Sequence, residues 1–392
     1  MAVIGTGLIG TSVALAARRQ GVTVFLSDRD PVAARTAAAL GAGHVGPPAA
    51  PVDLAVIAVP PSQVAAVLAQ TQANRLAVAY TDVASVKAGP EQAALSGAPD
   101  PERYVGGHPL AGREWSGPLA ARAELFRGRK WVLTPSRVTS PDTLDRALRL
   151  VELAEAVPVV MRSHDHDAAV AVTSHVPHLV ASLMAARLRD RPAGTSALAG
   201  QGLRDVTRIA GGDSRLWGDI LRSNAPAVTG VLRELHADLS RLLPALDALA
   251  QPGHQDRDTG LRTLVDLLDR GRLGLAVIPG ARPPKAPGDP RVRVPVAGRP
   301  GELARLVAAT AGLDVIAEDA DIDAAGDGDG GGNGDGGGDG DGDGLVVRFT
   351  VPPALADRMV AELRAAGWAA VREDAVPTHS GRDDGEDAAL PV

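Results

Sequence analysis

The sequence contains no cysteine. This absence excludes disulfide bonds, cysteine-ligated zinc, iron–sulfur clusters and cysteine nucleophiles. Aromatic residues are also scarce, with four Trp, two Tyr and three Phe among 392 residues, so any core must be built from aliphatic side chains. No apolar run reaches the roughly 18 to 20 residues of a membrane-spanning helix, and no basic segment precedes the apolar N-terminus. We therefore expect an unexported, cytoplasmic protein with no membrane partner.

Positive charge is in slight deficit, since the formal net charge is −7, and six of the acidic residues lie in one Gly/Asp tract at 326–344. A nucleic-acid partner is therefore not expected. With 45% hydrophobic and 22% charged residues the chain is globular in composition, and its length predicts two or three domains. Residues 1–4 look like the end of a strand, which leaves open whether the true start lies upstream.

Residues 1–138 alternate short apolar runs with helix-like stretches. The runs at 22–26, 54–59, 76–81 and 131–134 have the length and content of buried parallel strands. Helix ends are recognisable between them, as where Asp30 can act as an N-cap ahead of Pro31. This alternation predicts an α/β fold, a Rossmann-type doubly wound sheet.

The pattern changes near residue 139. Residues 139–275 are Leu/Ala-rich with helical periodicity and predict an all-α domain, and the Pro-rich stretch 276–291 reads as a linker. Residues 292–376 follow the order βαββαβ, with the tract 326–344 as an insertion between the second and third strands. The polar tail 377–392 has little to bury, so we expect it to be disordered.

A glycine fingerprint follows the first predicted strand. Gly5, Gly7 and Gly10 would supply a tight turn, close approach to a pyrophosphate and helix–strand contact. Asp28 ends the second strand, where a carboxylate can accept both ribose hydroxyls of NAD; it would repel the 2′-phosphate of NADP, although Arg29 could partly compensate. NAD is therefore the expected cofactor. The residues expected to contact it are Gly5, Gly7, Leu8, Ile9, Gly10, Asp28, Val59 and Asp82.

Four further segments carry polar residues that a fold without a binding or catalytic site would not need. TDVASVK at 81–87 and GGHPLAGREWSG at 106–117 follow predicted strands, at the edge where such sheets bind ligands. SHVPH at 174–178 and LRDVTRIAGGDSRLWGDILRSN at 203–224 place His, Asp and Arg on otherwise apolar helices. Charges buried there must be paired or face a ligand.

Together with GTGLIG at 5–10, these motifs resemble the prephenate/arogenate dehydrogenase family of tyrosine biosynthesis, in the family's order over roughly residues 1–250. The resemblance implies a Rossmann-type domain joined to a helical dimerisation domain, a homodimer, and an active site between the two domains. The C-terminal unit, with Arg299-Pro300-Gly301, resembles an ACT domain, which implies an amino-acid effector such as tyrosine. Gly298 replaces the usual acidic or amide residue, which weakens that expectation.

The resemblance implies NAD-dependent oxidative decarboxylation of prephenate to 4-hydroxyphenylpyruvate. His108 matches the family's catalytic His, which acts at the substrate hydroxyl. Ser85 would orient His108 and the substrate hydroxyl by hydrogen bonds. Arg208 matches the substrate-binding Arg for a carboxylate. His175 and Trp217 fall on positions that line the family's pocket, and Asp205, three residues before Arg208, could pair with it in the empty site.

Several alternatives stay open. Lys87 could hold a substrate carboxylate or only the Asp82 side chain. Arg113 stands where the family commonly has Ser or Thr; it could bind the pyruvyl carboxylate of prephenate or, paired with Glu114, the zwitterionic side chain of arogenate, so the substrate can be either or both. A catalytically silent NAD-binding amino-acid sensor is the alternative from another class. No metal is expected, because the four histidines at 164–178 show no ligand set on a shared face.

Overall fold

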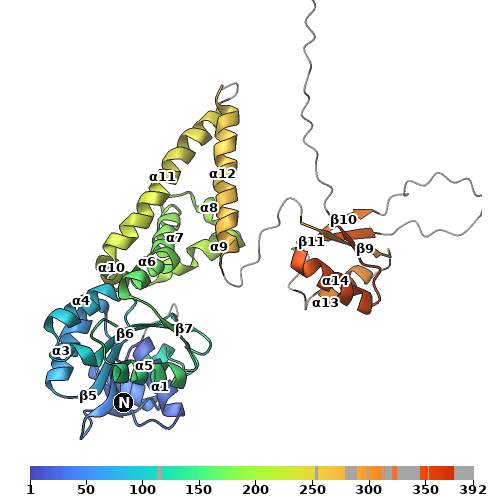
Figure 1. Cartoon of the computed structure of the whole chain (residues 1–392). Coiled ribbons are helices and arrows are strands. Elements are labelled where there is room, and N and C mark those ends of the chain that lie inside the picture. Colours follow the sequence, from blue (N-terminus) through green and yellow to red (C-terminus); the bar gives the residue numbers. More distant parts are fainter. Residues whose placement is uncertain are drawn as a thin grey trace, which may run out of the picture. The chain divides into compact units, whose positions relative to one another are not determined.

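The computed structural model describes residues 1–112, 117–251, 255–278, 289–297, 299, 301–310, 313, 320–324, 345–351 and 353–374. The chain divides into two compact units, residues 1–240 and 241–392 (Figure 1).

The first unit begins with an eight-stranded sheet in the order β3-β2-β1-β4-β5-β6-β7-β8. Neighbouring strands are parallel except for β6 and β7, which are antiparallel. This confirms the predicted Rossmann-type α/β fold. The strands are β1 Ala2–Ile4, β2 Phe25–Ser27, β3 His44–Val45, β4 Val52–Ile57, β5 Ala77–Asp82, β6 Tyr104–Pro109, β7 Lys130–Thr134 and β8 Val157–Val160.

Helices cover both faces of this sheet. They are α1 Leu8–Arg19, α2 Pro31–Ala39, α3 Val64–Ala73, α4 Ala88–Gly97 and α5 Pro141–Leu153. Alternate strand residues face opposite ways, so Val3 packs in the core with α1 and α5, whereas its neighbour Ala2 packs with α3 and α4. Both cores are mostly aliphatic, as the shortage of aromatic residues requires.

The end of this domain differs from the expectation. The sequence predicts one helix over 141–157 as the start of the helical domain, with the boundary at 138/139. In the structure α5 packs its buried Ala147, Leu150 and Val151 on the sheet, and β8 extends the sheet beside β7. The four-residue run of β8 is too short to stand out after a strongly amphipathic helix, so periodicity alone missed it. The helical domain therefore begins at α6.

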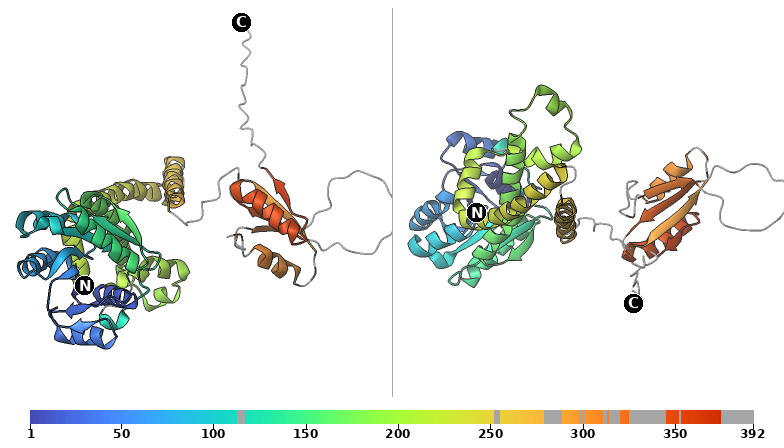
Figure 2. Two further views of the ribbon diagram at one scale, coloured as in Figure 1. Left: turned by 60° about the horizontal axis from the view of Figure 1, so that its bottom comes forward. Right: turned by 90° about the horizontal axis from the view of Figure 1, so that it is seen from above.

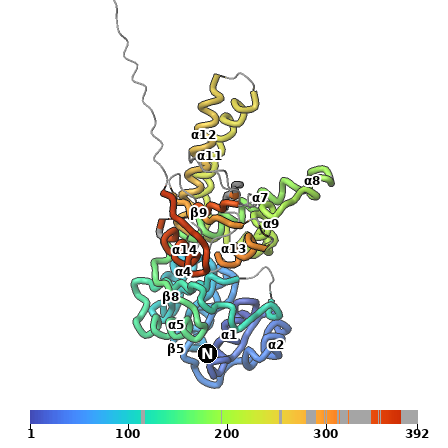
Figure 3. Tube along the Cα trace, turned by 90° about the vertical axis from the view of Figure 1, so that its right-hand side faces the viewer, coloured from blue at the N-terminus to red at the C-terminus, as the bar shows by residue number. Residues whose placement is uncertain are grey.

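The helical part comprises α6 Ser163–Val170, a π-helical turn Ala171–His175, α7 Val176–Ala186, α8 Ala193–Ala197, α9 Gln201–Thr207, the 3-10 turn Arg208–Gly211, α10 Ser214–Ser223, α11 Ala225–Ala250 and α12 Arg257–Ala276. The continuous segment Ser163–Ala186 is long enough to span a membrane and contains an 18-residue stretch with a mean hydropathy of 1.4. It nevertheless buries His166, Asp167 and His175, which bond to other elements of the same unit. Figure 3 shows α9 beside α7.

The C-terminal part of the second unit is a four-stranded antiparallel sheet in the order β10-β11-β9-β12. Helices α13 and α14 pack on one of its faces (Figure 2). The elements are β9 Arg291–Val296, α13 Glu302–Thr310, β10 Ala320–Ala324, β11 Leu345–Thr350, α14 Pro353–Ala365 and β12 Val371–Glu373. The order is the predicted βαββαβ, although the second strand lies at 320–324 rather than 313–319. The tract 326–344, linker residues 279–288, Gly298, Pro300 and the tail 377–392 lie outside the described residues.

Candidate active site

The glycine turn at the start of the chain is shaped by three separate constraints. Gly5 has a φ of +99°, and a Cβ there would lie 2.2 Å from the Ala58 carbonyl oxygen. A Cβ on Gly10 would lie 1.9 Å from the Gly5 carbonyl oxygen, so α1 can approach the turn only with glycine there. A Cβ on Gly7 would meet nothing within 4 Å, which leaves the backbone open to a ligand. Gly7 precedes α1, whose N-terminus has no side-chain cap and so presents backbone N–H groups to an anion.

Asp28 closes the other side of this turn. Its Oδ2 accepts hydrogen bonds from the Thr6 backbone nitrogen at 2.6 Å and from Thr6 Oγ1 at 2.9 Å, while Oδ1 accepts from the Asp30 nitrogen at 2.9 Å. A cavity of about 690 Å³ opens here, lined among others by Gly5, Gly7, Asp28, Arg29 and Val59. The open backbone, the uncapped helix and a carboxylate at the end of β2 fit a dinucleotide with a free ribose diol. Leu8 and Ile9 form the first turn of α1 at this place.

Asp82 lies deeper than the cavity and has other partners. It is fully buried, and its carboxylate pairs with Lys87 Nζ and accepts hydrogen bonds from Tyr104 Oη at 2.7 Å and the Ala84 nitrogen at 2.7 Å. Lys87 also donates to the Gly107 carbonyl oxygen at 2.7 Å. Lys87 is itself buried, so the structure favours the second role left open for it, which is to hold Asp82. The cofactor contact expected of Asp82 stays a prediction.

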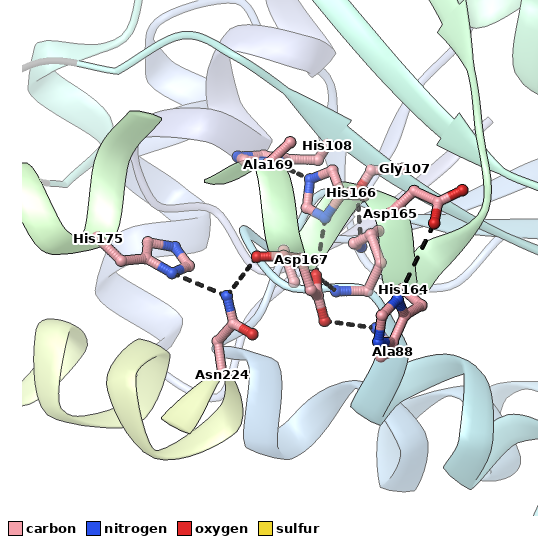
Figure 4. A network of polar contacts seen from close by, with 12 residues as sticks. Ala88, Gly107, His108, His164, Asp165, His166, Asp167, Ala169, His175 and Asn224 are labelled. Atoms are coloured by element: carbon pink, nitrogen blue, oxygen red, sulfur yellow. Dashed lines mark hydrogen bonds and ion pairs between the residues drawn. The ribbon is translucent and has the colours of Figure 1, made fainter. Parts of the chain in front are cut away.

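His108, at the carboxyl end of β6, heads a chain of polar contacts into the helical domain (Figure 4). Its Nδ1 lies 2.8 Å from His166 Nε2, and His166 Nδ1 lies 2.8 Å from Asp167 Oδ1. Asp167 in turn accepts from the backbone nitrogens of Lys87 at 2.7 Å and Ala88 at 2.9 Å, where α4 begins. Burial, together with the nearby His166, Lys87 and His175, lowers the pKa of His108 well below 6.5. His108 is therefore a neutral imidazole near pH 7.

His175 sits in the same region with a different set of partners. Asn224 Nδ2 donates to the Asp167 carbonyl oxygen at 2.8 Å and lies 3.1 Å from His175 Nδ1 (Figure 4). Burial lowers the pKa of His175 to about 4. Trp217 of α10 packs edge-on to His175, with ring centroids 6.1 Å apart, and stacks on His178 at 3.6 Å. These three rings form one aromatic cluster, and the substrate contacts expected of His175 and Trp217 stay predictions.

The remaining predicted site residues are Ser85, Arg208, Asp205 and Arg113. The side chain of Ser85 is partly buried, and among the described residues its hydroxyl makes no hydrogen bond with His108, so its orienting role stays a prediction. Arg208 is exposed where the 3-10 turn after α9 begins. Asp205 accepts from Gln201 Nε2 at 2.9 Å, and its pairing with Arg208 stays a prediction. Arg113 lies outside the described residues.

Three functional candidates were not predicted from the sequence: His166, Asp167 and Asn224. All three are buried. His166 and Asp167 are neighbours in α6, at the start of a segment that becomes apolar after them, and the rule that buried charges must be paired could have identified them. Asn224 closes the motif at 203–224, but a single amide carries no signal of its own.

Comparisons with known proteins agree with this arrangement. The model of the prephenate dehydrogenase nucleotide-binding domain matches residues 13–160, and that of the prephenate dehydrogenase dimerization domain matches residues 162–265. The first match ends with β8, in accord with the domain boundary of the structure.

Relatives with named activities include the probable prephenate dehydrogenase NovF of Streptomyces niveus, 39% identical over 94% of this chain and 98% of its own. The cyclohexadienyl dehydrogenase of Zymomonas mobilis is 32% identical over 63% of this chain and 88% of its own. Among solved structures, the prephenate dehydrogenase of A. aeolicus in complex with hydroxyphenyl propionate and NAD+ has a TM-score of 0.60 at 26% identity, covering 70% of this chain and 96% of the other. Synechocystis arogenate dehydrogenase has a TM-score of 0.56 at 25% identity, covering 70% and 98%. By its sequence, its two matched domains and its fold, the chain belongs to the prephenate dehydrogenase family.

Proposed function

We propose that this protein is an NAD-dependent prephenate dehydrogenase, which converts prephenate to 4-hydroxyphenylpyruvate with loss of carbon dioxide. The observation that carries the proposal is His108, a neutral imidazole at the carboxyl end of β6. β6 runs parallel to β5, which runs parallel to β4 and β1, so His108 lies at the same edge of the sheet as the glycine turn. The family membership supports the same activity.

The residues divide the chemistry between them. NAD held at the cavity beside Gly5, Gly7 and Asp28 would supply the acceptor for the hydride of the carbinol carbon. His108 accepts the proton of the ring hydroxyl as its oxygen becomes a carbonyl, which requires the neutral imidazole described above. The ring carboxylate leaves as carbon dioxide, and its bonding electrons pass through the ring to the carbonyl oxygen, which takes the proton back from His108 to give the phenol. The resulting aromatic ring makes the step effectively irreversible. No metal is needed at any point of this reaction.

A dicarboxylate substrate needs a fixed cation, and a planar guanidinium matches a carboxylate best. Arg208 is the candidate, supported by its match to the family motif and by its place after α9, which packs against α7. The cluster of His175, His178 and Trp217 supplies flat apolar faces for a six-membered ring.

Arogenate, as a second substrate or in place of prephenate, is the competing proposal. It is supported by the likeness to the Synechocystis arogenate dehydrogenase and by the departure at Arg113. The test is NADH formation by the purified full-length chain with prephenate and arogenate side by side at equal NAD. We expect higher kcat/KM with prephenate. If only arogenate is turned over, arogenate takes the place of prephenate as the proposed substrate. If neither compound is turned over, the proposed function is overturned.

A homodimer is proposed on two grounds. The matched dimerization domain covers residues 162–265, and α11 carries a stripe of exposed leucines at helical spacing, namely Leu235, Leu239, Leu243 and Leu246. Light scattering on the purified protein should give twice the mass of the chain, whereas a monomeric mass would contradict the dimer.

An ACT-like role for the C-terminal βαββαβ unit is supported by its element order and by Gly301, whose φ of +92° precedes α13. The effector expected there is an amino acid, with tyrosine the first candidate. Initial velocity should fall as tyrosine is added, and no change at millimolar tyrosine would end this idea.

A further inference from the structure

The proton on His166 can be located from the groups around it. Asp167 is the acceptor for two backbone N–H groups, at Lys87 and Ala88. Burial opposes its ionisation, but hydrogen bonds from His166 and from these two N–H groups outweigh burial and hold the pKa of Asp167 below its ordinary value. The Asp167 carboxylate can therefore only accept, so His166 Nδ1, 2.8 Å away, carries a proton.

The position of the proton on His166 determines which nitrogen of His108 carries a proton. In the arrangement that we infer, the one proton of the His166 ring lies on Nδ1, so its Nε2 is unprotonated and can only accept. His108 Nδ1 lies 2.8 Å from this Nε2, so His108 must donate from Nδ1. Because the His108 ring is neutral and holds one proton, its Nε2 then carries a lone pair.

From this geometry we propose that His166 and Asp167 are positioning residues that hold His108 in the tautomer with an unprotonated Nε2, ready to take the proton of the substrate alcohol. The inference rests on the proposed function, in which His108 is the general base. Without His166, His108 would be free to adopt the other tautomer, whose Nε2–H is a donor and cannot accept that proton.

Asp167 also fixes the tautomer of His175, through Asn224, and this tautomer is the opposite of the one inferred for His108. Asn224 donates through Nδ2 to the Asp167 carbonyl oxygen and reaches His175 Nδ1 with the same group. His175 Nδ1 therefore accepts, and the single proton of its neutral ring lies on Nε2. Asp167 thus links an acceptor histidine, through its side chain, to a donor histidine, through its main chain (Figure 4). The oxidation of a carboxylated alcohol uses both: an acceptor for the hydroxyl proton and a donor toward a substrate oxygen.

The test combines histidine tautomers with kinetics. In ¹⁵N-histidine-labelled full-length protein, NMR is expected to show His108 protonated on Nδ1 and His175 on Nε2. His166→Leu should lower kcat by roughly 10- to 100-fold, less than the about 10²- to 10⁴-fold cost of losing the base itself. The KM for prephenate and the Kd for NAD should stay within about twofold, because the base and both binding sites remain.

Two further variants separate positioning from a general loss of structure. His166→Gln offers an amide oxygen as acceptor to His108 Nδ1–H and should recover part of kcat. His164→Leu is the matched control two residues away, since the His164 side chain is 90% exposed, and it should behave like the wild type.

Either of two results would overturn the proposal: an unprotonated Nδ1 on His108 in the wild type, or a His166→Leu kcat no lower than that of His164→Leu. If His166→Leu fails to fold, the wild-type spectrum and His166→Gln decide. The spectrum needs no substrate, so it stands even if neither prephenate nor arogenate is turned over, which would instead contradict the proposed function.

Discussion

The ammonium group of Lys87 and the carboxylate of Asp82 form an ion pair from which solvent is completely excluded. Burial lowers the pKa of Lys87, and Asp82 opposes this shift; burial and Asp82 together raise the pKa of Tyr104 well above 10. Lys87 also holds the Gly107 carbonyl, directly before His108. A Cβ on Gly107 would lie 2.5 Å from the Asp82 carbonyl oxygen, so the glycine allows β6 to approach. The pair therefore positions the strand that carries the proposed base.

Replacing Lys87 should be among the most damaging single changes to stability. Lys87→Met leaves the Asp82 charge buried without its cation, and breaking a buried pair costs about 3 to 5 kcal/mol. Urea unfolding should show this loss, while Lys130→Met, which removes an exposed lysine from β7, should change the free energy of unfolding by less than about 0.5 kcal/mol. A loss below about 1 kcal/mol for Lys87→Met would show that the pair is dispensable.

His108 should be needed for turnover but not for cofactor binding. His108→Asn removes the proton acceptor and is expected to lower kcat by about 10² to 10⁴. NAD titration followed by protein fluorescence should give an unchanged Kd, because the cavity at Gly5, Gly7 and Asp28 does not include His108. An equal loss of NAD binding would instead identify His108 as a structural residue.

The sequence was sufficient where a local pattern encodes the structure. The glycine turn with Asp28 was predictable because each residue answers a separate steric or charge requirement within one strand–helix unit. The βαββαβ order was readable from periodicity, whereas the role of His108 stays a prediction that rests on the motif around it. Lys87 could not be assigned, because whether an ammonium faces Asp82 or a ligand depends on how closely two strands pack. The role of His166 was hidden for the same reason: its partner His108 is 58 residues away in the chain.

The activity should persist in mildly acidic solution. The base works only when neutral, and burial with His166, Lys87 and His175 facing it keeps the pKa of His108 well below 6.5, while Asp167 lies behind His166. kcat/KM should therefore stay level as the pH falls through 6.5 and decline only at clearly lower pH. A pH profile of NADH formation measures this, and an acid limb centred near 6.5 would contradict it.

The same shifts set the direction of acid destabilisation. Unfolded histidines titrate near 6.5, whereas folded His108 and His175 resist protonation, with a pKa of about 4 for His175. The unfolded state therefore binds more protons between these values, so the free energy of unfolding is fully retained above about pH 6.5 and falls as the pH drops toward 4. Urea midpoints at pH 7.5 and 5 should differ in this sense, and equal midpoints would argue that both rings are protonated without penalty.

Arg208 should contribute to substrate binding rather than to the chemical step. Removing a guanidinium–carboxylate contact costs about 1.5 to 3 kcal/mol, so Arg208→Ala should raise the KM for prephenate by roughly 10- to 100-fold with a smaller effect on kcat. Arg204→Ala is the matched control, since Arg204 is an exposed arginine on the neighbouring turn of α9. Steady-state kinetics of both variants settle the role, and similar KM values for the two would remove Arg208 from the site.

Asp28 should decide between NAD and NADP. Its carboxylate braces the turn through Thr6 and lines the cavity, where it can accept the ribose hydroxyls and repel a 2′-phosphate. Asp28→Ser removes that repulsion and keeps Arg29, so the KM for NAD should rise about tenfold while NADP becomes a usable cofactor. Asp53→Ser, which removes a carboxylate that is 89% exposed, is the control and should leave the preference unchanged. If Asp28→Ser weakens both cofactors equally, the carboxylate serves only to hold the Thr6 turn, and the preference for NAD must come from another contact.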